Sequence, residues 1–288
     1  MNHIFKIIWN TVSQCWVAVS ELSKSIAKSF KTDKSKRVTT IIGTVFLTGI
    51  TTNVLAETNV VLDDNGNIVG GKEASAFAGV GKAGDSVVLG NNAKSEGTES
   101  IVIGNGTTNT GRWSVTLGDQ ATGNSQYGVT IGERASSGKG SNSVVIGLMA
   151  KTSNEKKGGN SQTAVGAASY ADGEGASAFG ANANATGSTA TAIGLATKAI
   201  AQSASAFGDS ASASAWGATA LGVGASAKAD NSIAVGSAAV TEGRESTALG
   251  RRSYAGAQSA TALGTLANAS AIVSTAVGNG AKASAFQA

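Results

Sequence analysis

A short apolar run that ends in glycine recurs along most of the chain. The glycines that close these runs are Gly90, Gly104, Gly118, Gly132, Gly147, Gly166, Gly180, Gly194, Gly208, Gly222, Gly236, Gly250, Gly264 and Gly278. Eleven of their thirteen spacings are 14 residues, one is 15 and one is 19. Side chains before each glycine alternate with period two, as in a β-strand. The pattern predicts a repeat of about 14 residues built from short strands.

Alignment on the glycine places similar residues in columns. The residue directly before it is always large and apolar: Leu89, Ile103, Leu117, Ile131, Ile146, Val165, Phe179, Ile193, Phe207, Leu221, Val235, Leu249, Leu263 and Val277. The third residue after it is always small, and the fifth nearly always is, with Asn109 as the exception. We expect the large column to form the core of each unit.

Fourteen residues can hold two strands of about five residues and two tight turns. Such a unit cannot bury its apolar column alone, but stacked units pair each strand with its equivalent in the next unit. Glycine supplies a turn with positive φ. Proline, which would delete ladder hydrogen bonds, is absent from the sequence. The predicted fold is all-β, a β-solenoid over residues 85–288.

One large residue per unit gives a thin core for a single chain. In the later repeats the middle of the run is alanine, at Ala164, Ala178, Ala192, Ala206, Ala220, Ala234, Ala248, Ala262 and Ala276. We expect this alanine column to face another subunit at close range, which predicts an obligate homo-oligomer with a continuous interface.

The first 56 residues predict an exported protein. Lys34, Lys36 and Arg37 precede an uncharged stretch from Val38 to Ala56, the order of a secretory signal. Its threonines and glycines make a membrane anchor the weaker alternative. We predict cleavage between Ala56 and Glu57.

Residues 57–84 form a predicted lead-in to the solenoid. The stretch from Val60 to Val69 has the pattern of a β-hairpin with Asn65 and Gly66 at its turn. Asp63 and Asp64 lack the spacing of a calcium loop, so they are interpreted as turn residues.

Charge and composition exclude several classes of function. Net charge is +4, but residues 1–56 hold seven of the 22 basic and two of the 18 acidic residues, which leaves 15 − 16 = −1 beyond them. The basic balance therefore belongs to the leader and does not indicate a nucleic-acid partner. The single Cys and the single His also lie in the leader, so no Ser-His-Asp, Cys-His or His-based metal site is expected beyond it. We predict no enzyme and no cofactor.

The leader resembles the extended signal peptide region of Gram-negative autotransporters. The residues that carry this resemblance are Met1-Asn2, Ile7-Ile8-Trp9-Asn10, Trp16 and Val19-Ser20-Glu21. It implies export by the Sec machinery with a slowed passage through the inner membrane. The residues alone equally allow an N-terminal amphipathic helix on acidic lipid.

The repeats are similar to those of YadA-like trimeric autotransporter adhesins. NSVVIGLMA (142–150) and NSIAVGSAA (231–239) match the NSVAIGxxS repeat of that family. The resemblance implies a left-handed parallel β-roll of three chains, displayed at the bacterial surface, that binds host matrix proteins such as collagen or a cell-surface receptor. It makes the motif residues candidates for ligand binding: Asn142, Ser143, Val144, Ile146, Asn231, Ser232, Ile233 and Val235.

The 19-residue spacing contains an insertion, KTSNEKKGGN (151–160). Insertions in repeat proteins map to loops on one side, often a binding side. Lys151, Lys156 and Lys157 are therefore further candidates for a basic contact, with a solvated loop as the alternative.

Three functions follow as hypotheses. The first is an adhesin head that mediates attachment to host matrix or cells, with autoaggregation and biofilm formation. The second is a structural spacer of a surface fibre without a ligand of its own. The third is an ice-binding array on Thr189, Thr191, Thr219, Thr247, Thr261 and Thr275, which interspersed Ser and Ala argue against.

Neither a coiled-coil stalk nor a membrane-anchor domain is evident in the sequence. We therefore expect an N-terminal portion of such a protein, held at the outer membrane in a full-length form and secreted if truncated.

Overall fold

The computed structural model describes residues 5–10, 15–20, 60–62, 68–71, 73–76, 86–153 and 160–288. The chain divides into two units, Met1–Thr39 and Thr40–Ala288. In the first, β1 (Phe5–Asn10) pairs antiparallel with β2 (Cys15–Ser20), with Trp9 opposite Trp16. The described part of the leader is thus a pair of strands, and the helix that its residues also allowed does not form there.

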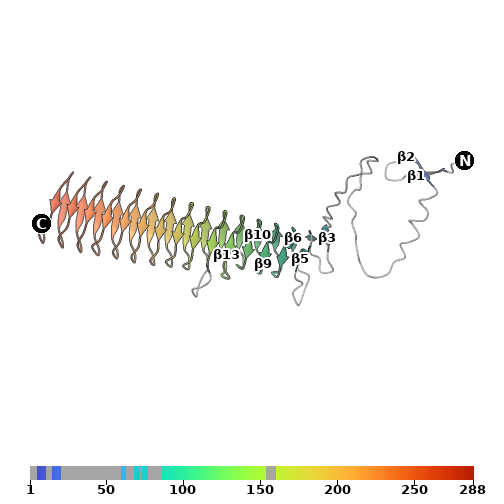
Figure 1. The fold of residues 1–288 in the computed structure, drawn as a ribbon, viewed down its shortest axis with the longest axis horizontal. Coiled ribbons are helices and arrows are strands. Elements are labelled where there is room, and N and C mark those ends of the chain that lie inside the picture. Colours follow the sequence, from blue (N-terminus) through green and yellow to red (C-terminus); the bar gives the residue numbers. More distant parts are fainter. Residues whose placement is uncertain are drawn as a thin grey trace. The chain divides into compact units, whose positions relative to one another are not determined.

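The second unit contains a parallel β-solenoid, as predicted (Figure 1). We call each 14-residue turn a coil. Each coil gives one three-residue strand to a 16-stranded sheet and one two-residue strand to a 15-stranded sheet, and each strand pairs in register with its equivalent in the next coil. The strands are shorter than the five residues expected, because two left-handed corners and the residues that flank them take up the rest of each coil.

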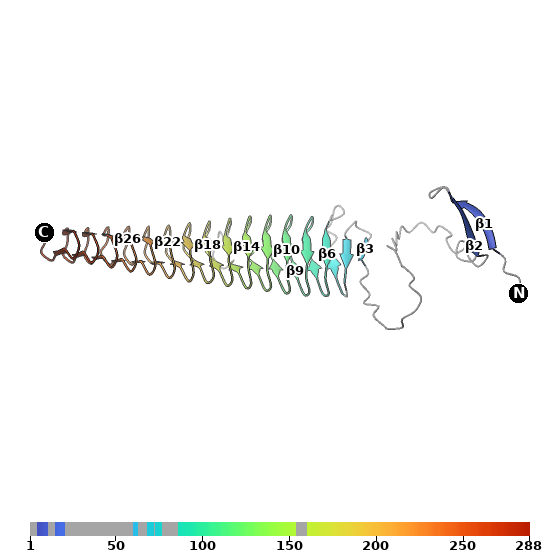
Figure 2. The ribbon, with the colours of Figure 1, turned by 90° about the horizontal axis from the view of Figure 1, so that it is seen from above.

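The 16-stranded sheet runs along one side of the stack (Figure 2). Its strands are β3 (Val60–Leu62), β4 (Ile68–Gly70), β6 (Val87–Leu89), β8 (Ile101–Ile103), β10 (Val115–Leu117), β12 (Val129–Ile131), β14 (Val144–Ile146), β16 (Thr163–Val165), β18 (Ser177–Phe179), β20 (Thr191–Ile193), β22 (Ser205–Phe207), β24 (Thr219–Leu221), β26 (Ile233–Val235), β28 (Thr247–Leu249), β30 (Thr261–Leu263) and β32 (Thr275–Val277).

The 15-stranded sheet forms the other side of each coil. Its strands are β5 (Ser75–Ala76), β7 (Lys94–Ser95), β9 (Thr108–Asn109), β11 (Thr122–Gly123), β13 (Ser136–Ser137), β15 (Lys151–Thr152), β17 (Tyr170–Ala171), β19 (Asn184–Ala185), β21 (Lys198–Ala199), β23 (Ser212–Ala213), β25 (Ser226–Ala227), β27 (Val240–Thr241), β29 (Tyr254–Ala255), β31 (Asn268–Ala269) and β33 (Lys282–Ala283).

The predicted hairpin is part of this stack. Strand β3 pairs antiparallel with β4, and β4 pairs in parallel with β6. The turn residues between β3 and β4 lie outside the described residues. Gly71 has a φ of 114° and lies against the backbone of Gly90, as the repeat glycines do with their successors. The solenoid therefore begins at Ile68 rather than at residue 85.

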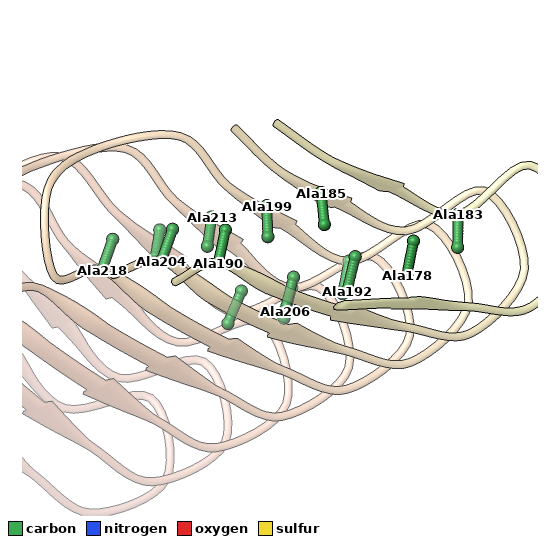
Figure 3. Packing of buried hydrophobic residues seen from close by; sticks show 14 of the residues in the cluster. Ala178, Ala183, Ala185, Ala190, Ala192, Ala199, Ala204, Ala206, Ala213 and Ala218 are labelled. Carbon is green, nitrogen blue, oxygen red and sulfur yellow. The ribbon is translucent and has the colours of Figure 1, made fainter. Parts of the chain in front are cut away.

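The structure places the alanine column in the core, where we expected the large apolar column. The alanine column is buried inside the coil of its own chain, between the two sheets (Figure 3). The large column points outward: Ile193 is 40%, Leu221 47% and Leu249 43% exposed. Period-two alternation is the same whichever set faces inward, and the narrow space between the sheets is filled mostly by small side chains, with Asn109 and Gln162 as exceptions.

Four small side chains per coil fill this core. They lie four and two residues before the glycine and three and five residues after it; in one coil they are Ala190, Ala192, Thr197 and Ala199. Figure 3 shows Ala185, Ala199 and Ala213 on one sheet facing Ala178, Ala192 and Ala206 on the other. The third residue after the glycine is small, and the fifth nearly always is, because both face inward.

Asn109 is accommodated by the next coil. Its Nδ2 donates to the carbonyl of Gly111 at 2.8 Å, and its Oδ1 accepts from Ser114 Oγ at 2.9 Å and Thr116 Oγ1 at 3.2 Å. A Cβ at Gly123, the equivalent residue one coil on, would lie 2.7 Å from that Oδ1. The larger amide therefore occupies space that the glycine leaves.

The repeat glycines are required by the stacking itself. At Gly194, φ is 133°, and a Cβ there would lie 2.6 Å from the carbonyl oxygen of Gly208 in the next coil. A side chain would thus meet backbone that cannot move without parting the two coils, in a conformation that L-residues rarely adopt. This explains why this column never varies.

Candidate functional site

Two outward surfaces of the solenoid differ in chemistry. The apolar face is the outer side of the 16-stranded sheet, formed by the first and third residues of its strands. The polar face is the outer side of the 15-stranded sheet, formed by the first residue of its strands and the residue that follows each strand.

The apolar face carries no charged side chain in the described coils. From β6 onward its third-residue column is the large apolar one, and none of these large residues is buried. Its first-residue column is Val or Ile in the six strands from β4 to β14 and mostly Thr or Ser afterwards. A continuous apolar surface of this length on a single chain indicates a protein interface.

The polar face carries hydroxyl, amide and charged groups. Lys228 Nζ lies 2.8 Å from Glu242 Oε1, and Tyr254 OH donates to Glu242 Oε2 at 2.8 Å. The hydrogen bond from Lys228, then that from Tyr254 and the charge of Lys228, hold the pKa of the Glu242 carboxyl below its usual value. The hydrogen bond between Tyr254 and Glu242 raises the pKa of the Tyr254 hydroxyl. This network joins three successive coils.

The motif residues divide between core, corner and apolar face. Ser143 and Ser232 are fully buried inside the coil, so their side chains are not open to an external ligand, contrary to the expectation. Asn142 and Asn231 occupy left-handed corners, with φ of 58° and 55°. Asparagine tolerates this conformation better than most residues, so the corner explains its presence in the motif.

The apolar members of the motif lie on the apolar face. They are Val144, Ile146, Ile233 and Val235, each at an end of strand β14 or β26. Among the lysines of the insertion, Lys151 is exposed on the polar face in β15, whereas Lys156 and Lys157 lie outside the described residues, as do Ala56 and Glu57. The structure therefore does not bring the described candidate residues together in one site.

The threonines considered for ice binding do not form one array. Thr191 and Thr219 lie in the first-residue column of the apolar face, but Ser205 separates them and Ile233 follows. Thr189 occupies a left-handed corner instead, with a φ of 55°. Thr247, Thr261 and Thr275 do follow one another in register, but this run spans three coils beside the bulky column and does not extend along the solenoid.

A feature that the sequence analysis missed lies at one corner of the early coils. The rings of Trp113 and Tyr127 stack with centroids 4.9 Å apart, the Arg112 guanidinium lies 4.5 Å from the Trp113 centroid, and Trp113 Nε1 donates to Glu99 at 2.7 Å. Glu99, Trp113 and Tyr127 are each 14 residues apart, so the repeat period was the signal that would have paired them.

Within the described residues no three His, Cys, Asp or Glu side chains gather as metal ligands. In that same part of the chain, no helix has the length and apolar character needed to cross a membrane.

Both the leader and the repeats match known protein families. The extended signal peptide of the type V secretion system matches residues 1–50. The YadA head domain repeat matches residues 82–107, 163–183, 171–197, 217–239, 227–253, 242–267 and 255–281. The chain belongs to the YadA-like trimeric autotransporter adhesins. No curated protein matches the sequence.

Membership of the YadA-like family agrees with the geometry. The matched head repeats coincide with the coils of the solenoid, so this part of the chain is a YadA-like β-roll and a surface adhesin-type domain. The match over residues 1–50 indicates export through type V secretion and display at the cell surface.

Proposed function

We propose that the coils form the head of a homotrimer that attaches the bacterium to host extracellular matrix or to host cells. The observation that carries this proposal is the contrast between the two faces. An apolar surface along the whole solenoid calls for a partner of equal length and matching repeat, and a second and third copy of the same chain supply one.

The apolar face is the proposed interface between subunits. Each large residue that becomes covered contributes on the order of 1 kcal/mol, since about half of its side chain is already buried. Many such residues in register along the stack supply the stability that an alanine core lacks. In this arrangement Val144, Ile146, Ile233 and Val235 serve assembly rather than ligand binding.

The polar face is the proposed attachment surface. It stays outward when the apolar faces meet, and it repeats similar groups once per coil. Weak contacts repeated along an extended partner such as collagen add up through avidity. Lys151 belongs to this surface and keeps its candidate role.

A binding assay with the purified full chain tests the proposal. Light scattering should give the mass of three chains, and the trimer should bind surfaces coated with collagen, other matrix proteins or host cells, and aggregate cells in suspension. A trimer that binds none of these and aggregates no cells would contradict the adhesin role.

The spacer function remains the alternative, favoured by the uniform spacing of the coils from Gly166 to Gly278. Removal of residues 194–221 joins Ile193 to Gly222 and deletes two whole coils without changing the columns. A spacer should keep all of its attachment after this deletion, whereas an adhesin head should lose affinity in proportion to the contacts removed.

A further inference from the structure

The described lysines of the solenoid gather on the polar face. Five of the six in residues 86–153 and 160–288 lie there, and the exception is Lys139. The five are Lys94, Lys151, Lys198, Lys228 and Lys282. The acidic residues of this face among the described coils are three, Glu96, Asp172 and Glu242. The surplus of lysine favours an anionic partner.

Two stretches of the polar face present the same three side chains in successive coils. In the first, Tyr170 pairs in register with Asn184, and Asn184 pairs with Lys198. The second has the same order, with Tyr254, Asn268 and Lys282. The second follows the first after 254 − 170 = 84 residues, which is six coils, or about 29 Å along the stack. We call each set a Tyr-Asn-Lys ladder.

The asparagine of each ladder offers a donor. Asn184 Oδ1 and Asn268 Oδ1 are buried and have no hydrogen-bond partner among the described residues. The amide nitrogen is therefore the group that each of these side chains turns outward. The next coil adds an exposed lysine ammonium, another donor without acceptor capacity. Each ladder thus requires a ligand rich in acceptors.

The tyrosine of the second ladder lies across the sheet. A Cβ at Gly256 would lie 2.5 Å from Tyr254 Cε1 and 2.7 Å from its hydroxyl oxygen, so the ring occupies the space over this glycine. The hydrogen bond to Glu242 fixes the end of the ring. Because the ring is half-exposed and held, it can stack on a flat apolar surface of a ligand at little entropic cost.

We propose that each Tyr-Asn-Lys ladder binds an anionic saccharide. The tyrosine ring stacks on the C–H face of a sugar ring, the asparagine amide donates to a hydroxyl group, and the lysine pairs with a carboxylate or a sulfate. The three groups lie in a row along the stack, as an extended polysaccharide would, and the two ladders give such a chain two points of attachment. The inference rests on the proposed outward position of the polar face.

Surface plasmon resonance with the full chain tests the proposal. The immobilised probes are heparin, which carries sulfate, hyaluronan, which carries only carboxylate, and neutral dextran. We expect heparin, hyaluronan or both to bind and dextran not to bind, and the two acidic probes distinguish the anion. Lys282→Gln and Tyr254→Leu should each weaken binding about tenfold.

The matched control is Lys94→Gln, which removes the same charge from the same column of the polar face but outside both ladders. Its effect should be less than about twofold. Circular dichroism and light scattering on each variant separate a local loss of binding from a loss of fold.

Equal weakening by Lys94→Gln and Lys282→Gln would overturn the proposal in favour of a diffuse cationic surface. Failure of both acidic probes to bind would overturn it too, and retained attachment to matrix protein would then leave the adhesin role intact. Loss of collagen binding in Lys282→Gln without any saccharide binding would assign the ladder to a protein ligand instead.

Discussion

The apolar and polar faces are built by the same coil backbone, yet they carry opposite chemistry. Both sheets pair in register from coil to coil, and both send small side chains into one shared core. Their chemistry differs in the outward residues, where one sheet shows Ile, Leu and Phe and the other Lys, Asn, Ser and Tyr. The inward positions therefore determine the fold. The residues of each outward face can change to suit a different binding partner without altering it.

The largest effect should come from charges on the apolar face. Phe207→Lys together with Leu221→Lys places two cations per chain in the proposed interface, where neither has a partner, and the trimer should be lost entirely. Light scattering coupled to size exclusion gives the mass.

The matched variant carries Ser212→Lys and Ser226→Lys in the same two coils but on the polar face. It should remain trimeric, because its added charges stay in water. Equal masses for the two double variants would show that the two faces do not differ in assembly.

The next effect tests the corners that join the two faces. Gly194→Ala places a Cβ against the carbonyl of Gly208 at a φ of 133°, which should cost at least about 3 kcal/mol of unfolding free energy. Urea unfolding followed by circular dichroism measures it.

Gly224→Ala is the control, since Gly224 has a φ of 65° with open space around it, and Ala196 and Ala238 already occupy the equivalent corner. It should cost about 1 kcal/mol or less. A similar loss at both glycines would refute the close approach of neighbouring coils as the reason for the glycine column.

A third experiment separates the shared core from the faces. Ala206→Leu inserts a large side chain between the sheets and should destabilise the fold by about 3 kcal/mol. Ser212→Leu makes a similar change in volume on the outward side of the polar face and should change stability by less than about 0.5 kcal/mol. The opposite order in urea unfolding would return the large column to the core.

The smallest effect concerns the ionised groups of the polar face. Because the pKa of Glu242 is lowered, its contribution to stability is present above its ordinary value and fades as the pH falls through the folded one. The raised pKa of Tyr254 works in the other direction, with a contribution that is lost as the pH rises through the folded value. Water screens both groups, so stability should change by less than about 0.5 kcal/mol.

Titration of the Glu242 carboxyl by nuclear magnetic resonance measures this directly. Lys228→Met should return its pKa toward the usual range, and Tyr254→Phe should do so by less, since Lys228 is the larger cause. An unchanged titration in both variants would contradict the hydrogen-bonded network.

The period, the glycine corners and the parallel stack of coils were all predictable from the sequence. Each of these follows from one-dimensional spacing, because a fixed repeat can only pair strands with their equivalents. The hairpin before the solenoid was also readable, since Asn65-Gly66 specifies a turn between two apolar runs. The Asn109 exception was visible in the sequence, but its explanation needed Gly123 one coil away.

Which of the two alternating sets lies inside could not be predicted, because it depends on how the coil closes in three dimensions. Ala206 and Phe207 are neighbours in one strand, and size alone assigned the phenylalanine to the core. The structure reverses this because two sheets joined by such tight corners enclose room mostly for alanine, serine, threonine and valine, with Asn109 and Gln162 as the larger exceptions. The stacking of coils also places Tyr, Asn and Lys from three successive coils in one row. In the sequence these residues are 14 positions apart.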